Sequence, residues 1–112
     1  MIRTIVLYED HFLKFHKDQE LTVQEKIEYV LDMVRFENHV PKRFFKRLEN
    51  TDGIYEVRVI TSFKSIRILC FLDDGNLVVL MNCFLKKTQK TPKKEINLAE
   101  KLKKEYLNNK NV

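Results

Sequence analysis

The sequence has 112 residues, of which 44% are hydrophobic and 33% charged, with only two Gly and two Pro. This composition excludes collagen-like, low-complexity and linker-like chains, and it predicts one compact domain over residues 1–112 that can bury a core without disulfide or metal staples. The net charge of +5 is unevenly placed, because residues 1–41 carry eight acidic and five basic side chains, whereas residues 42–112 carry sixteen basic and eight acidic ones.

The first third of the chain predicts a strand followed by a helix. Residues 3–8 are rich in β-branched side chains, which is typical of a strand. Thr22 is placed to cap a helix, and the apolar residues after it recur on one helical stripe: Val23, Ile27, Val30, Leu31 and Val34. Pro41 should end this segment, and residues 42–48 then predict a short basic helix with Phe44, Phe45 and Leu48 facing inward.

Three strands are predicted after the turn at Asp52-Gly53, over about residues 54–62, 65–72 and 77–85. The link at residues 73–76 contains Asp-Gly, so the last two strands should form an antiparallel hairpin. Alternation along the first strand places Glu56 and Arg58 on one face, and Arg67 takes the alternate face of the second. The third strand is apolar on both faces, which indicates an internal strand.

The C-terminal part predicts a lysine-rich loop and a final helix. Thr91 and Pro92 have the chemistry of a helix start, and the helix should run to about Asn108, with residues 108–112 frayed. Its buried stripe is Ile96, Ala99, Leu102 and Tyr106. The elements together predict an α+β fold: an N-terminal strand and helices, an antiparallel sheet of about four strands, and a C-terminal helix packed on that sheet.

Several classes of protein are disfavoured by what the sequence lacks. It has no apolar run of membrane-spanning length and no signal peptide, so we expect a cytoplasmic protein without a membrane partner. Cys70 and Cys83 show neither CxxC nor Cys/His spacing, which favours reduced, buried, structural thiols. The three histidines share no ligand spacing, and no Gly-rich phosphate loop or HExxH occurs. No metal and no cofactor are therefore predicted.

Two arginines form the first candidate site. If their strands are neighbours, Arg58 and Arg67 emerge on one sheet face, and Lys86 at the end of the third strand can join them. Three fixed cations suit a phosphodiester, because arginine donates two hydrogen bonds to phosphate and stays charged. The alternative is that both arginines are solvated or paired, for example with Glu56.

The second candidate is the loop over residues 86–94, which holds five lysines in nine residues. Its cations, hydroxyl groups and free backbone N–H groups could clamp a nucleic-acid backbone, and a solubilising lysine run is the alternative.

Candidates for acid–base and base-binding roles are fewer. Glu56 could take a proton from a ribose 2′-OH or instead position Arg58. Asn82, expected on one face with Leu80 and Phe84, could bind a base or be a satisfied core residue. The aromatic residues among the strand cations could stack on bases, although most should be core: Tyr55, Phe63, Phe71 and Phe84.

Four segments together resemble the phage-derived HigB-like toxins of the RelE/ParE superfamily. They are GIYEVR at 53–58, SIRILCF at 65–71, LVVL at 77–80 and FLKKTQKTPKKEI at 84–96. The resemblance covers residues 53–106 well and residues 1–50 in outline. It implies a RelE-like fold and a toxin of a type II toxin–antitoxin system: a metal-independent endoribonuclease that cuts mRNA in the ribosomal A site by 2′-OH attack and so inhibits translation.

The resemblance also assigns residues. Matching positions imply that the catalytic or phosphate-binding group is Arg58, Arg67, Lys86 and Lys87. Residues expected to bind RNA around it are Gln89, Lys90, Lys93, Lys94 and Lys64. Many relatives have His-Gly before the Phe of the last strand, whereas this chain has Asn82-Cys83, so a histidine role at that position does not carry over.

Two other functions remain open within the superfamily. One is a ParE-like poison of DNA gyrase, and the other is a degenerate toxin that only binds its antitoxin. In each case we expect a cognate antitoxin, a small helix-turn-helix protein with an acidic or amphipathic segment that docks on residues 42–112.

Overall fold

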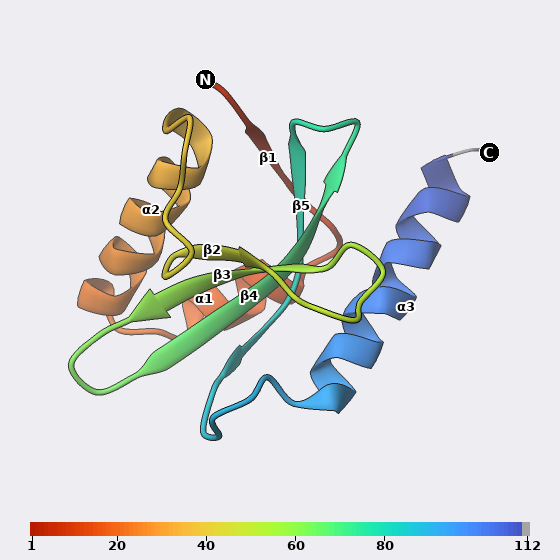
Figure 1. The fold of residues 1–112 in the computed structure, drawn as a ribbon. Helices are drawn as coiled ribbons and strands as arrows, with labels where there is room; N and C mark the ends of the chain where they lie inside the picture. The colour runs from red at the N-terminus through yellow and green to blue at the C-terminus, as the bar shows by residue number, and fades with distance from the viewer. Residues whose placement is uncertain (111–112) are drawn as a thin grey trace.

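The computed structural model describes residues 1–110 and, within them, contains five strands and three helices (Figure 1). In chain order these are β1 (Thr4–Leu7), α1 (His11–Lys17), α2 (Leu21–Phe36), β2 (Phe45–Arg47), β3 (Tyr55–Ile60), β4 (Ser65–Asp73), β5 (Leu77–Leu85) and α3 (Lys93–Lys110). No helix in the described part of the chain is long and apolar enough to cross a membrane.

The strands form one mixed sheet in the order β1-β5-β4-β3-β2. The predicted hairpin of β4 and β5 is confirmed, with Asp73 opposite Leu77. The α+β class is confirmed as well, although the sheet has five strands where about four were expected. The added pairing is parallel: β1 lies beside β5, because α1 and α2 carry the chain away from β1 before the antiparallel strands begin.

Helices cover the sheet on both faces, and a separate core fills each interface (Figure 1). On one face α1 and α2 pack on the side chains of Val57, Val59, Ile66 and Ile68. On the other face α3 packs on Leu69, Phe71, Val79 and Met81. The two faces alternate along β3 and β4 as the sequence predicts, and β5 is an internal strand buried on both sides.

A bulge in β5 changes the alternation at one point. Ile68 lies opposite Cys83 and Cys70 lies opposite Leu80, so Leu69 alone faces two residues of β5. As a result Leu80 packs toward α2, whereas Asn82 bonds to α3. The expectation that Asn82 shares a face with Leu80 is therefore wrong.

The predicted helix over residues 42–48 is also wrong. A turn closes where the N–H groups of Phe44 and Phe45 donate to the Pro41 carbonyl, and the chain then enters β2. Lys46 pairs with Glu56 across the ladder to β3. Backbone pairing with β3 outweighs the weak helical pattern of this segment. As a result, Phe45 and Leu48 lie on opposite faces of the sheet.

The helices differ from prediction in several respects. The seven-residue α1 carries no clear sequence pattern and was not predicted. Helix α2 begins at Leu21, one residue before its expected cap, and Glu20 holds the N-cap position. Helix α3 stays helical to Lys110, beyond the expected end at Asn108, because the Lys110 ammonium is bound by Asp73 at 2.9 Å. Residues 111–112 of the expected frayed tail lie outside the described residues.

Candidate nucleic-acid interface

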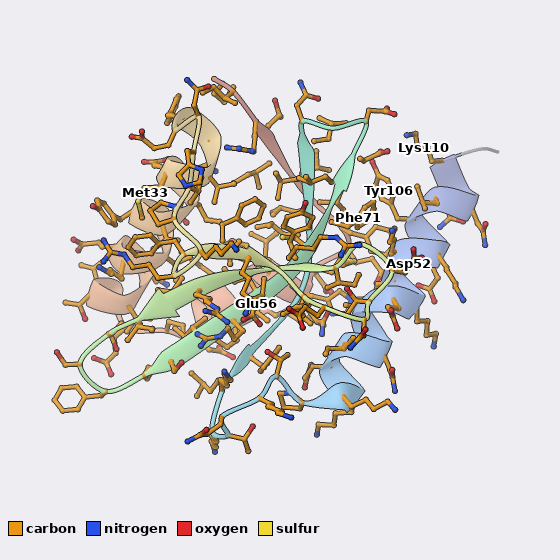
Figure 2. The ribbon with its side chains drawn as sticks, viewed as in Figure 1. Met33, Asp52, Glu56, Phe71, Tyr106 and Lys110 are labelled. Atoms are coloured by element: carbon orange, nitrogen blue, oxygen red, sulfur yellow. The ribbon has the colours of Figure 1, made fainter. Side chains whose placement is uncertain are left out.

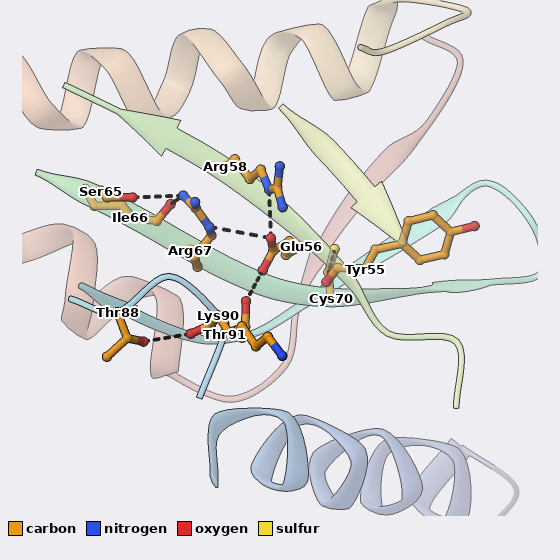
Figure 3. Close-up of polar contacts among 10 residues, drawn as sticks. All are labelled: Tyr55, Glu56, Arg58, Ser65, Ile66, Arg67, Cys70, Thr88, Lys90 and Thr91. Atoms are coloured by element: carbon orange, nitrogen blue, oxygen red, sulfur yellow. Dashed lines mark hydrogen bonds and ion pairs between the residues drawn. The ribbon is translucent and has the colours of Figure 1, made fainter. Parts of the chain in front are cut away.

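Arg58 and Arg67 are direct partners across β3 and β4, on the face that packs against α3. Strand alternation thus brings the two arginines together as predicted. Both turn toward the carboxylate of Glu56, as Figure 3 shows. The Nε of Arg58 donates to Glu56 Oε1 at 2.7 Å, and the Nε of Arg67 lies 3.5 Å from the same oxygen.

The carboxylate of Glu56 is fully buried at the centre of this cluster (Figures 2 and 3). Its second oxygen, Oε2, accepts a hydrogen bond of 2.7 Å from the hydroxyl of Thr91. Two like charges opposite each other on a sheet destabilise it, and Glu56 compensates for this repulsion. Because both carboxylate oxygens are already engaged, the geometry favours positioning of the arginines over proton abstraction from a substrate.

The two arginines are not equally accessible. Arg67 is buried, and its guanidinium also donates to Ser65 Oγ at 3.1 Å and to the Ile66 carbonyl at 3.2 Å. Burial lowers the pKa of Arg67, and Arg58 lowers it further, whereas Glu56 acts in the opposite direction. The Arg58 side chain keeps 24% of its surface exposed. Arg58 is therefore the more accessible of the two arginines. The expectation that Arg67 emerges on the surface is wrong, because its side chain is buried.

A pocket of about 370 Å³ opens beside Arg58. Lys86, the residue after β5, lines this pocket together with Arg58. The pKa of Lys86 is lowered, first by burial and then by the charge of Arg67, while Glu56 opposes the shift. Gln89, Lys90 and Thr91 close the pocket from the lysine-rich loop, in which Thr88 donates to the Lys90 carbonyl at 2.7 Å.

Lys46 is a further cation of this pocket, and the sequence pattern does not predict its place there. It lies opposite Glu56 in the ladder between β2 and β3, so its side chain shares the face of Glu56 and Arg58. Residues 44–48 read FFKRL and show no apolar–polar alternation, so the local pattern does not mark this segment as a strand. The side chains of Leu48 and Ile96 form the apolar part of the lining of the same pocket.

Four of the predicted site residues lie outside the pocket lining: Lys87, which was expected in the catalytic or phosphate-binding group, and Lys93, Lys94 and Lys64, which were expected to bind RNA. Lys87, Lys93 and Lys94 are exposed around the loop and the first turn of α3. Lys64 lies between β3 and β4, and its ammonium group donates to Gln19 Oε1 at 2.9 Å. The structure therefore gathers Arg58, Arg67, Lys86, Gln89 and Lys90 and leaves these four lysines apart.

Other candidate groups have structural partners. Asn82 is buried, and its amide donates to the carbonyl and the side chain of Glu95 at 3.1 and 3.0 Å, which fits the core role. Both cysteines are free, and burial raises the pKa of the Cys83 thiol to about 12 and that of Cys70 as well. Residues 1–110 contain no group of three or more His, Cys, Asp or Glu side chains arranged to hold a metal ion.

This chain matches a known protein family. Residues 14–104 match the family described as phage-derived protein Gp49-like (DUF891), which is most of the sequence. The chain belongs to the Gp49-like family. No curated protein has a significant match to it.

The solved structures show the fold. This Gp49-like chain is similar to RelE in the crystal structure of the archaeal RelE–RelB complex from Pyrococcus horikoshii OT3, with a TM-score of 0.56 and 13% sequence identity. The similarity covers 81% of this chain and 100% of the archaeal one. The predicted membership of the RelE superfamily is thus confirmed by family and fold, and the HigB-like subtype stays a prediction.

Proposed function

We propose that this Gp49-like protein is the toxin of a type II toxin–antitoxin system and acts in the cytoplasm as a ribosome-dependent mRNA endoribonuclease. The observation that carries the proposal is the excess of positive charge around one buried carboxylate. Arg58, Arg67, Lys46 and Lys86 surround Glu56, so the pocket retains a net positive charge suited to a phosphodiester.

The proposed reaction needs no metal. The ribose 2′ oxygen forms a bond to the adjacent phosphorus and gives its proton to solvent water, while the bond from phosphorus to the 5′ oxygen of the next nucleotide breaks and that oxygen gains a proton. Negative charge builds up on the phosphorane, where the exposed N–H groups of Arg58 and the ammonium of Lys46 can stabilise it. Lys86 lines the same pocket and is suited to give the proton to the leaving oxygen, because burial and the charge of Arg67 lower its pKa.

The partners follow from the same proposal. A toxin of this kind is neutralised by a cognate antitoxin, here expected to be a small helix-turn-helix protein, and the archaeal RelE of similar fold was crystallised with RelB. The exposed Lys87, Lys90, Lys93 and Lys94 beside the pocket would meet the RNA of the message and of the ribosome.

The test is expression of the wild-type chain without an antitoxin, with the ends of cellular RNA mapped and DNA breaks scored in the same culture. We expect growth arrest with new 5′ ends inside translated mRNA, reduced when translation initiation is blocked. Intact mRNA with DNA breaks would instead identify a gyrase poison of the ParE type, and unaffected growth would identify a degenerate antitoxin-binding protein.

A further inference from the structure

A second hollow, of about 480 Å³, lies between the β3–β4 connection and the start of α2. Ile60, Phe63 and Val23 supply its apolar lining. None of its lining residues also lines the pocket at Arg58, so the two sites are separate on the surface.

Phe63 is unusual in its exposure. Its surface is 97% accessible, and that of Ile60 is 58% accessible. Single exposed apolar residues are common on soluble proteins, but a large aromatic side chain beside another exposed apolar residue at the rim of a hollow is typical of a binding anchor.

The turn that carries Phe63 is held in one conformation. The Thr61 hydroxyl oxygen accepts hydrogen bonds from the backbone N–H groups of Phe63 and Lys64 at 3.3 and 2.9 Å. The Thr61 N–H donates to the Lys64 carbonyl at 2.9 Å, and the Lys64 ammonium bonds to Gln19. Because the turn is already ordered, docking of a partner here loses little conformational entropy.

The charges around the hollow indicate the chemistry of the partner. Lys26 and Lys64 line it together with one acidic residue, Glu20, so the lining favours an apolar group with acidic neighbours. Another exposed apolar surface, around Tyr29 on α2, is lined by Glu25, Glu28 and Asp32 and would repel such a segment.

We propose that this hollow is the docking site of the antitoxin. An apolar side chain of an acidic antitoxin segment packs against Phe63 and Ile60, and acidic residues beside it pair with Lys26 and Lys64. This inference rests on the proposed toxin function for the existence of the antitoxin. Its consequence is that antitoxin capture and phosphate chemistry use different residues of the chain.

The test measures the affinity of the purified chain for the small protein encoded by the adjoining reading frame. We expect Phe63→Ala to weaken binding roughly 10- to 100-fold, as truncation of a central anchor does. Phe36→Ala is the matched control, because Phe36 is also exposed, at 56%, and lines neither hollow. Lys64→Glu should weaken binding in the same direction through charge reversal.

The same variants are then expressed with and without the antitoxin. Phe63→Ala should still arrest growth but escape neutralisation, whereas Phe36→Ala should be neutralised like the wild type. Equal affinities of Phe63→Ala and Phe36→Ala overturn the docking site. Loss of mRNA cleavage by Phe63→Ala at unchanged antitoxin affinity also overturns it and assigns Phe63 to RNA stacking. A wild type that binds the antitoxin but cuts no mRNA refutes the nuclease function and leaves the affinity comparison valid.

Discussion

Two buried carboxylates on the α3 face of the sheet, Glu56 and Asp73, differ in the charge that surrounds them. Asp73 is bound by one ammonium, from Lys110, and by the Tyr106 hydroxyl at 3.0 Å. Glu56 has two arginines in contact and two lysines nearby. The charge of Asp73 is balanced by Lys110, and this ion pair fixes the end of α3. The cations around Glu56 outnumber it, and the resulting excess of positive charge suits an anionic ligand.

The largest effect is expected from Glu56→Gln. This substitution keeps the side-chain volume but leaves Arg58 and Arg67 facing each other without a counter-charge. Breaking a buried ion pair in this way should cost about 3–5 kcal/mol of the free energy of unfolding. Chemical denaturation measures the loss, and Glu49→Gln, at an exposed position of the pocket rim, is the control expected to change little. Equal stability of the two variants would contradict the central role of Glu56.

Arg58→Ala should reduce the rate of mRNA cleavage roughly 10²- to 10³-fold, the usual loss when one donor to a developing oxyanion is removed. Single-turnover cleavage on translating ribosomes measures it. Lys101→Ala removes a cation that is exposed, lies outside the pocket and is assigned no contact with RNA, so its rate should fall only slightly. If both variants cut equally well, the site assignment is wrong.

Thr91→Val should produce a smaller effect. It removes the hydroxyl that bonds to Glu56 and leaves a buried carboxylate oxygen without that partner, at a cost of about 1–3 kcal/mol. We expect faster amide exchange in the loop over residues 86–90 and a higher KM at nearly unchanged kcat. Thr91→Ser keeps the hydroxyl and should restore both values; failure of this rescue would show that the hydrogen bond does not hold the loop.

The smallest effect is expected at Asp73. Hydrogen bonds from Lys110 hold the pKa of this carboxyl below its ordinary value of 3.8, although burial acts in the opposite direction. A lowered pKa in the folded state contributes stability that is complete above the ordinary value and is lost as the pH falls through the folded value. Thermal unfolding should therefore show Asp73→Asn a few degrees less stable than the wild type at neutral pH, with the gap closing below about pH 4. A gap independent of pH would exclude an ionic contribution.

Local alternation accounts for what could be predicted of the candidate site. Glu56, Arg58 and Arg67 share a face because side chains in a strand alternate, and that period is visible in the sequence. Position along the chain also placed Lys86 at the end of β5, next to Arg67. The spacing of apolar residues likewise predicted α2 and α3, since each helix needs one buried stripe.

The parts that could not be predicted depend on contacts distant in sequence. Lys46 reaches the pocket only because residues 45–47 pair with β3 instead of forming a helix. Thr91, expected to cap α3, instead bonds to Glu56, 35 residues away. The bulge that turns Asn82 toward α3 appears only when β4 and β5 are aligned.

The sequence by itself determined the order of most elements, the two faces of each strand and the concentration of positive charge in residues 42–112. Tertiary structure decided which of those charges act together, because it buried Arg67, left Arg58 accessible and added Lys46 to the pocket. The physical reason is that periodicity follows from the geometry of a single strand or helix, whereas burial and charge balance depend on which other elements pack beside it.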